Sequence, residues 1–155
     1  MLPDNAQDYY SEKIWRLPQT YIAVDGFEVG VPTLHRENLN IPEDSIVILS
    51  AQSGSKRHPQ IVRLQFKILK AVPNSYLLIK GLAQEEAIQS FFNQFASEEG
   101  VDTNKLRFLP MVPSEAVHRA NLGIADIVLD TYPYNGATTT LETLWMGIPL
   151  VTKVG

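Results

Sequence analysis

Short apolar runs alternate with longer amphipathic segments from Ser45 onward. The runs at 45–50 and 75–80 are apolar almost throughout, which is typical of strands buried on both faces of a sheet. The amphipathic segments place apolar residues three or four positions apart, as Ile61, Leu64 and Ile68 do, and this spacing predicts helices. The pattern predicts strands at 45–50, 75–80, 106–110, within 124–130 and at 148–152, and helices at 59–72, 83–99, 114–123 and 138–147.

Start and stop signals support these helices. Pro59 suits a first helical turn, Ser114 is a good N-cap, and Gly100 and Gly147 end the segments before them. Strands that alternate with helices in this way form parallel sheets covered by helices on both faces. The sequence therefore predicts a Rossmann-like α/β fold.

The first 44 residues lack this alternation. They contain four prolines and read as an irregular leading segment or interdomain linker, so we expect the Rossmann-like domain to occupy 45–155. The chain stops three residues after its last predicted strand, without a closing helix. We expect a domain that is incomplete at its C-terminus, and a truncated or partial chain.

Composition narrows the class of protein. With 155 residues, of which 45% are hydrophobic, the chain can fill one ordinary core. A net charge of -4, from 13 basic and 17 acidic residues, argues against non-specific nucleic-acid binding. The absence of cysteine excludes disulfides, thiolate zinc sites and a cysteine nucleophile. No segment resembles a signal peptide or a membrane span. We expect a cytoplasmic protein with no membrane, nucleic-acid, metal or cofactor partner.

The stretch TYPYNGATTTLETLWMG, residues 131–147, is the first candidate for chemistry. Ligands of open parallel sheets bind beyond the carboxyl ends of the strands, and this stretch follows the fourth predicted strand. A helix that starts near Thr138 offers free backbone N–H groups and the positive end of its dipole to an anion such as phosphate. Thr138 and Thr139 add hydroxyl groups, and Gly136 permits close approach of the backbone. The alternative is an ordinary threonine cap.

Glu142 lies four residues after Thr138 and therefore on the same helical face. A carboxylate in that position can accept hydrogen bonds from two sugar hydroxyls, as acidic residues do for ribose in dinucleotide-binding folds. The alternative is that Glu142 only complements the helix dipole. The helix start and Glu142 together indicate a nucleotide with a diphosphate.

Two further loops end at the same predicted edge. The loop after the first strand carries Gln52 and Lys56, and the lysine can stabilise negative charge on a departing diphosphate. After the third strand, Val112 can offer backbone groups to a base, and His118 can stack on a base or bind phosphate. The alternatives are a solvated basic loop and a surface histidine.

Three segments carry a family resemblance. The segments FLPMVPSEAVHRANLGIADIVLDTYPYNGATTTLETLWMGIPLVT, RLQFKILKAVPNSYLLIKG and YYSEKIWRLPQTYIAV resemble the C-terminal catalytic region of the O-linked N-acetylglucosamine transferase family, including its plant SPINDLY branch. The resemblance implies one half of a two-domain, inverting GT-B glycosyltransferase that transfers N-acetylglucosamine from UDP-N-acetylglucosamine to protein Ser or Thr. It also implies that an N-terminal catalytic half and tetratricopeptide repeats normally precede this region.

The resemblance also implies roles for individual residues. Thr138 and Thr139 would bind the diphosphate, and Glu142 would bind the ribose. Gln52 and Lys56 match the glutamine and lysine of the first loop, where the lysine assists departure of UDP. Val112 and His118 fall where the family contacts uracil.

This sequence departs from the animal members at two positions. They carry a histidine where this chain has Ala137 and a lysine where it has Ser114. The SPINDLY branch uses GDP-fucose, so the donor stays open. Two other hypotheses remain: a non-catalytic Rossmann-like remnant or interaction module, and another GT-B sugar-nucleotide enzyme. We expect the isolated chain to transfer no sugar.

Overall fold

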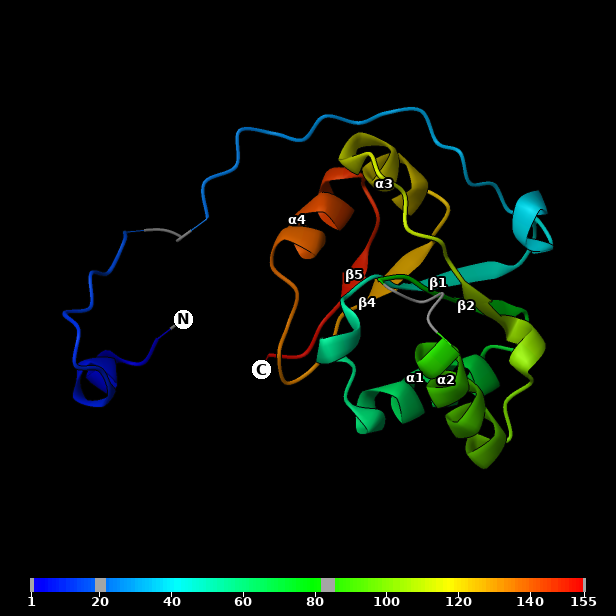
Figure 1. The fold of residues 1–155 in the computed structure, drawn as a ribbon, viewed down its shortest axis with the longest axis horizontal. Coiled ribbons are helices and arrows are strands. Elements are labelled where there is room, and N and C mark those ends of the chain that lie inside the picture. The colour runs from blue at the N-terminus through cyan, green and yellow to red at the C-terminus, as the bar shows by residue number, and fades with distance from the viewer. Residues whose placement is uncertain (1, 19–21, 82–85, 155) are drawn as a thin grey trace.

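A parallel sheet forms the centre of the molecule (Figure 1). The structure is a computed structural model of the 155-residue chain that describes residues 2–18, 22–81 and 86–154. Within these residues, five strands are ordered β3-β2-β1-β4-β5, and every neighbouring pair is parallel. The strands are β1 (Ile46–Ser50), β2 (Ser75–Ile79), β3 (Leu106–Phe108), β4 (Ile127–Leu129) and β5 (Leu150–Val151).

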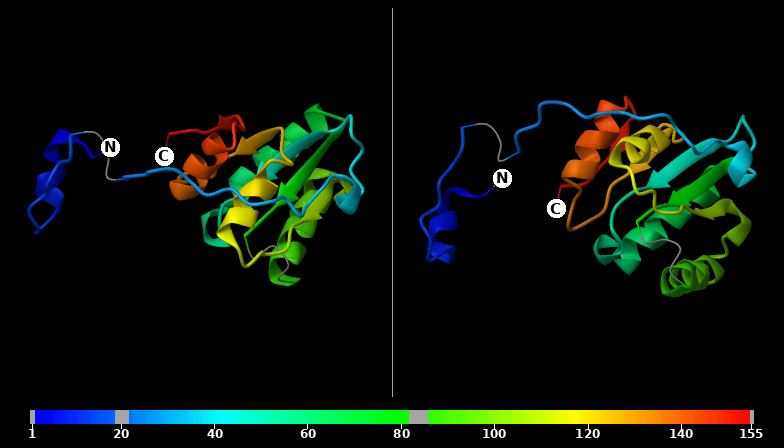
Figure 2. Two further views of the ribbon diagram at one scale, coloured as in Figure 1. Left: turned by 90° about the horizontal axis from the view of Figure 1, so that it is seen from above. Right: turned by 45° about the horizontal axis from the view of Figure 1, so that its top comes forward.

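Helices cover both faces of this sheet. Helices α1 and α2 lie on one face and α3 and α4 on the other, an arrangement that Figures 1 and 2 show from three directions. The α-helices are α1 (Pro59–Ala71), α2 (Glu86–Glu99), α3 (Glu115–Leu122) and α4 (Thr138–Trp145), and the 3₁₀ helices are η1 (Asp4–Tyr9), η2 (Glu37–Leu39), η3 (Gly54–Lys56) and η4 (Thr103–Lys105). The predicted Rossmann-like fold is confirmed.

The predicted elements correspond one to one with those observed, and they differ mainly at their ends. The third and fifth strands are shorter than predicted because Pro110 and Pro149, without N–H groups, cannot donate to a strand ladder. Residues 83–85 of the predicted second helix lie outside the described residues. None of the helices in the described part of the chain has the length and apolar character needed to cross a bilayer.

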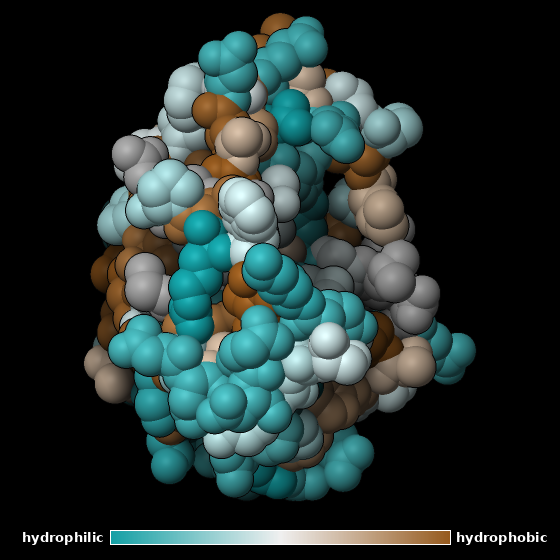
Figure 3. All heavy atoms as spheres, turned by 90° about the vertical axis from the view of Figure 1, so that its left-hand side faces the viewer, coloured by the Kyte–Doolittle hydropathy of each residue, from teal (hydrophilic) through white to brown (hydrophobic). Residues whose placement is uncertain are grey.

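The strand order determines where a sheet of this kind binds a ligand. From β1 the chain moves outward to β2 and β3, then returns to place β4 on the other side of β1. The loops after β1 and β4 therefore leave the carboxyl edge of the sheet in opposite directions. Open parallel sheets bind ligands at such a switch point, and we call this point the crevice. Figure 3 views the molecule from the left-hand side of Figure 1, where residues 2–18 stand in front of the sheet and hydrophilic residues predominate.

Two apolar layers hold the helices to the sheet. On the face of α1 and α2, Phe66 and Phe92 pack edge to face with their ring centroids 6.3 Å apart, and both are fully buried. On the other face, Leu49, Leu122 and Val128 belong to a second buried cluster beneath α3 and α4. The sheet is thus apolar on both sides, as its continuous hydrophobic runs predict.

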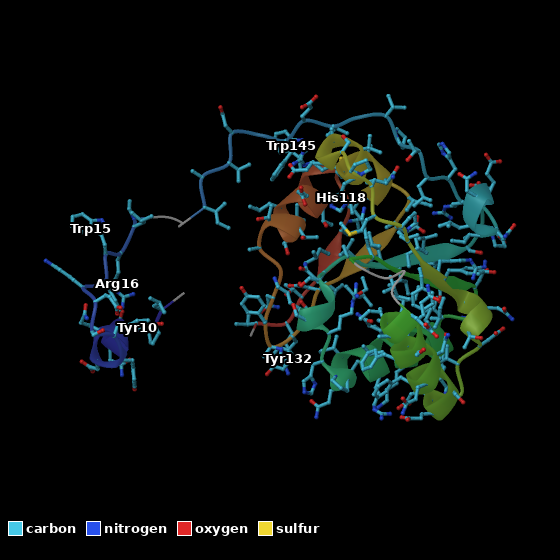
Figure 4. The ribbon with its side chains drawn as sticks, viewed as in Figure 1. Tyr10, Trp15, Arg16, His118, Tyr132 and Trp145 are labelled. Atoms are coloured by element: carbon cyan, nitrogen blue, oxygen red, sulfur yellow. The ribbon has the colours of Figure 1, made fainter. Side chains whose placement is uncertain are left out.

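An extended segment, residues 22–34, crosses α3 and α4 (Figure 1). Gly30 N donates to the carbonyl of Ala116 at 3.0 Å. The buried Asn121 accepts from the amides of Thr33 and Leu34 at 2.8 and 3.1 Å. Residues 2–18 lie away from the sheet, as the labelled Trp15 in Figure 4 shows. We call residues 22–34 the strap.

Truncation of Phe92 tests the packing of α2. Phe92→Ala removes a fully buried ring that contacts three other phenylalanines, so we expect the free energy of unfolding to fall by about 3–5 kcal/mol. Urea denaturation measures the loss. Leu64→Ala on the exposed side of α1 is the control, with an expected change within about 0.5 kcal/mol. Equal small losses in both variants would contradict this packing.

Candidate active site

The loops after β1 and β4 meet at the crevice. Lys56, at the end of η3, donates from Nζ to the carbonyl of Asn135 at 3.2 Å, and the same atom lies 4.3 Å from the centre of the Tyr134 ring. Gln52 is buried and donates from Nε2 to Oδ1 of Asp130 at 3.4 Å. The structure therefore brings the two residues predicted in the first loop next to the segment that leads into α4.

Asp130 organises that segment. Its Oδ1 accepts from the backbone amides of Thr131 and Gly136, each at 2.8 Å. Its Oδ2 accepts from Nδ2 of Asn135 at 3.1 Å and from Oγ1 of Thr152 at 2.8 Å. Hydrogen bonds to a carboxylate are among the stronger ones in proteins, so they fix the path from β4 to α4. No role was predicted for Asp130 from the sequence. Its position directly after a buried strand is the signal that could have identified it.

Gly136 has no room for a side chain. A Cβ atom added there would lie 2.0 Å from Nε2 of Gln52 and 2.6 Å from Oγ1 of Thr140. The close approach expected at this glycine is thus made, in this structure, by the amide of Gln52. The glycine is what allows the two loops to touch.

Helix α4 begins without a side-chain cap. Its N-cap residue is Ala137, and no side chain accepts a hydrogen bond from its first turn, whereas His58 caps α1 and Ser114 caps α3. The alternative of an ordinary threonine cap is therefore wrong. Thr138 is exposed and Thr139 half-buried at this open helix start. This helix start follows the loop after β4, at the carboxyl edge of the sheet.

Side chains of α3 hold the carboxylate of Glu142 in position. It is only 7% exposed, and its Oε1 accepts from Nε of Arg119 at 2.9 Å. Arg119 is itself fixed, because its other nitrogens donate to the carbonyl of Glu28 in the strap and to the carboxylate of Glu115. The second oxygen of Glu142, Oε2, lies 3.7 Å from Nε2 of His118. Glu142 thus faces the neighbouring helix and does not simply complement its own helix dipole.

His118 lies on the side of α3 that faces the strands (Figure 4). Burial lowers its pKa, and the nearby charge of Lys80 lowers it further, against the opposite effect of Glu142. The imidazole is therefore neutral at pH 7, with one nitrogen that donates and one that accepts. It is not the solvated surface histidine of the alternative interpretation.

Two cations beside these groups are buried, which the sequence did not predict. Arg57 donates to the carbonyls of Gln52 and Lys80, which joins the ends of β1 and β2, and burial lowers its pKa to about 10. Lys80 directly follows β2, and burial lowers its pKa to about 8. In the sequence both residues resemble ordinary solvated charges. Only the fold shows that they are buried.

The predicted site residues fall into two adjoining groups. Gln52, Lys56 and Gly136 meet at the β1–β4 crevice, and His118 meets Glu142 between α3 and α4; helix α4 joins the groups through Thr138 and Thr139. Val112 lies half-buried in the loop before α3. Among the described residues, no group of three His, Asp or Glu side chains is arranged to hold a metal ion.

Comparison with known sequences identifies related proteins. Residues 27–155 match the profile of glycosyl transferase family 41. The chain is 32% identical over 155 residues to a probable UDP-N-acetylglucosamine–peptide N-acetylglucosaminyltransferase SPINDLY of Oryza sativa subsp. japonica, covering 99% of this chain and 16% of that protein. It is 33% identical over 150 residues to the Arabidopsis thaliana enzyme named SEC, covering 92% and 15%. The chain thus spans about a sixth of the length of these relatives.

Solved structures agree with the fold. A mutant of the Thermobaculum terrenum O-GlcNAc transferase superposes with a TM-score of 0.66 at 31% identity, over 74% of this chain and 24% of that chain. The C-terminal domain of a glycosyl transferase group 1 protein, LpcC of Francisella tularensis, superposes with a TM-score of 0.57 at 15% identity, over 81% and 69%. The second likeness concerns the fold alone, which is that of GT-B glycosyltransferases.

A methyl group at Gly136 tests the contact between the loops. Gly136→Ala must displace the buried Gln52 side chain, so we expect a loss of about 1–3 kcal/mol in the free energy of unfolding. Gly54→Ala is the matched control in the opposing loop, because its methyl group meets Ile88 Cδ1 at an ordinary 3.4 Å. Urea denaturation of both variants measures the difference. A Gly136→Ala variant with an unchanged free energy of unfolding would contradict the contact.

The lowered pKa of His118 predicts a dependence of stability on pH. The unfolded chain binds a proton on this residue more readily than the folded chain, so His118 makes the free energy of unfolding fall as the pH drops through about 6.5. We expect His118→Gln to reduce this fall between pH 7 and 5.5, measured by urea denaturation at each pH. His35→Gln, at an exposed histidine, should leave the fall unchanged; an unchanged fall in His118→Gln would contradict the burial of the imidazole.

Proposed function

We propose a donor-binding function on the premise that this chain belongs to glycosyl transferase family 41. In this proposal, residues 45–155 bind the nucleotide of a nucleotide sugar, and a longer polypeptide transfers the sugar to Ser or Thr hydroxyls of proteins. The relatives named as peptide N-acetylglucosaminyltransferases support N-acetylglucosamine as the sugar and UDP-N-acetylglucosamine as its donor. By the same analogy, the longer polypeptide would supply an N-terminal catalytic half and tetratricopeptide repeats and would act in the cytoplasm.

The uncapped start of α4 beside Lys56 is the observation that carries the proposal. The first turn of the helix presents unsatisfied N–H groups and a partial positive charge. Thr138 and Thr139 add hydroxyl donors, and Lys56 reaches the same segment from the other side of the crevice. A diphosphate bound here would be met by donors from both loops, at the place where open parallel sheets bind nucleotides.

The nucleoside would extend from the diphosphate toward α3. Glu142 has one oxygen fixed by Arg119 and the other directed at His118, so Oε2 can accept a hydrogen bond from a ribose hydroxyl. The neutral His118 can stack on or hydrogen-bond the base, with backbone groups near Val112 at its edge. This order of subsites follows the strands, from β4 and β1 toward β2 and β3.

The proposed chemistry is a direct displacement at the anomeric carbon of the sugar. The acceptor hydroxyl forms the new glycosidic bond as the bond to the diphosphate breaks, with inversion at that carbon. Negative charge then grows on the departing diphosphate, where Lys56 and the start of α4 stabilise it. Lys56 is thus the catalytic residue of the proposal, and this chain provides no group that we assign as the general base.

Calorimetric titration of the full-length protein with UDP and GDP tests the proposal and identifies the nucleotide. We expect Lys56→Ala and Thr139→Val each to weaken binding of the preferred nucleotide about tenfold or more, because each removes a donor to the diphosphate. Lys67→Ala on the exposed side of α1 and Thr103→Val in the exposed η4 are matched controls and should bind as the wild type does. Unchanged affinity in both site variants would overturn the assignment.

A further inference from the structure

The ammonium group of Lys56 is held by two neighbouring residues of the loop after β4. Its Nζ donates to the carbonyl of Asn135 at 3.2 Å and lies 4.3 Å from the centre of the Tyr134 ring. The negative face of an aromatic ring attracts an ammonium group at this distance. A lysine carries three N–H donors, and among the described residues Asn135 provides the only acceptor for them. Donors therefore remain for a ligand.

The backbone that carries the Tyr134 ring is fixed. The carbonyl of Tyr134 accepts from Oγ1 of Thr131 at 2.8 Å. The next residue, Asn135, donates from Nδ2 to the carboxylate of Asp130 and to the carbonyl of Thr131. The ring itself is 68% exposed, so core packing does not account for its position. Tyr134 is thus an exposed aromatic side chain on a fixed loop, with its ring beside Lys56.

A ring is well suited to hold this particular cation. A lysine side chain is long and flexible, and a ligand that must order it loses binding free energy. Charge stabilisation is most effective when the donors are in place before the reaction. A carboxylate in the place of the ring would also hold the ammonium group, but its charge would repel a diphosphate. The aromatic face attracts the ammonium group and carries no net charge.

We propose that Tyr134 is a positioning residue for Lys56, and that the face of its ring holds the ammonium group where the diphosphate binds. This inference rests on the proposed function, in which Lys56 stabilises the departing diphosphate. The ring acts through Lys56, and the hydroxyl group of Tyr134 takes no part.

Calorimetric titration of the full-length protein with UDP and GDP tests the inference. Tyr134→Leu removes the ring, and we expect it to weaken binding of the preferred diphosphate about three- to tenfold. Tyr134→Phe keeps the ring without the hydroxyl and should bind within about twofold of the wild type, since the ring face attracts the cation. Equal losses in the two variants would assign the effect to the hydroxyl and would overturn the inference.

A double variant separates positioning from a structural role. If Tyr134 acts through Lys56, Tyr134→Leu has nothing left to affect once the ammonium group is gone. We therefore expect Lys56→Met/Tyr134→Leu to bind the diphosphate as Lys56→Met does. The same three- to tenfold loss in both backgrounds would show that the ring supports the loop in general, which would overturn the inference.

Tyr132 is the matched control in the same loop. Its ring centre lies 4.3 Å from Nζ of Lys153, an exposed lysine without a proposed role. Tyr132→Leu therefore removes an equivalent ring–ammonium contact and should bind the diphosphate as the wild type does. A loss equal to that of Tyr134→Leu would contradict a specific effect on Lys56.

The outcomes distinguish the inference from the function on which it rests. If the wild type binds neither UDP nor GDP, or if Lys56→Met binds as tightly as the wild type, the proposed role of Lys56 fails and the inference fails with it. If Lys56→Met weakens binding while Tyr134→Leu does not, only the assignment of Tyr134 fails.

Discussion

The candidate site depends on the carboxylate of Asp130, which holds the segment after β4 in one shape and joins it to the loop after β1. Its two oxygens accept hydrogen bonds from Thr131, Asn135, Gly136 and Thr152, and Gln52 reaches it from the opposite loop. These bonds, together with those that Asn135 makes to the carbonyls of Thr131 and Lys153, set the direction in which α4 begins. Asp130 thereby helps to set the position of the uncapped first turn of that helix relative to Lys56.

A second constraint is electrostatic and lies between α3 and α4. Glu142 is buried, and its carboxylate lies against Arg119 and the neutral His118. Arg119 also donates a hydrogen bond to the carbonyl of Glu28. The strap, α3 and α4 are thus linked through Arg119 to the same carboxylate. A buried ion pair of this kind rarely adds much net stability, but it fixes geometry. That is the property a nucleotide-binding site needs, because ligand groups must meet donors already in place.

The fold was predictable from the sequence because it rests on local patterns. Continuous apolar runs mark the buried strands, and Pro59 and Ser114 mark helix starts that the structure confirms. The carboxyl edge of the sheet could also be predicted, since it follows from strand order. The details of the site depend on contacts between distant residues, such as Gln52 with Asp130 and Arg119 with Glu142, which no local pattern reveals. Arg57 and Lys80 look like surface charges in the sequence, and only the packing of the folded chain buries them.

A crystal structure of the full-length protein with its preferred nucleoside diphosphate tests the central claim most directly. The account predicts the diphosphate at the start of α4, in contact with Lys56 and Thr139, and a ribose hydroxyl against Glu142. A nucleotide found elsewhere on the molecule, or one bound in the crevice with its base at the start of α4 and its phosphates toward α3, would contradict it.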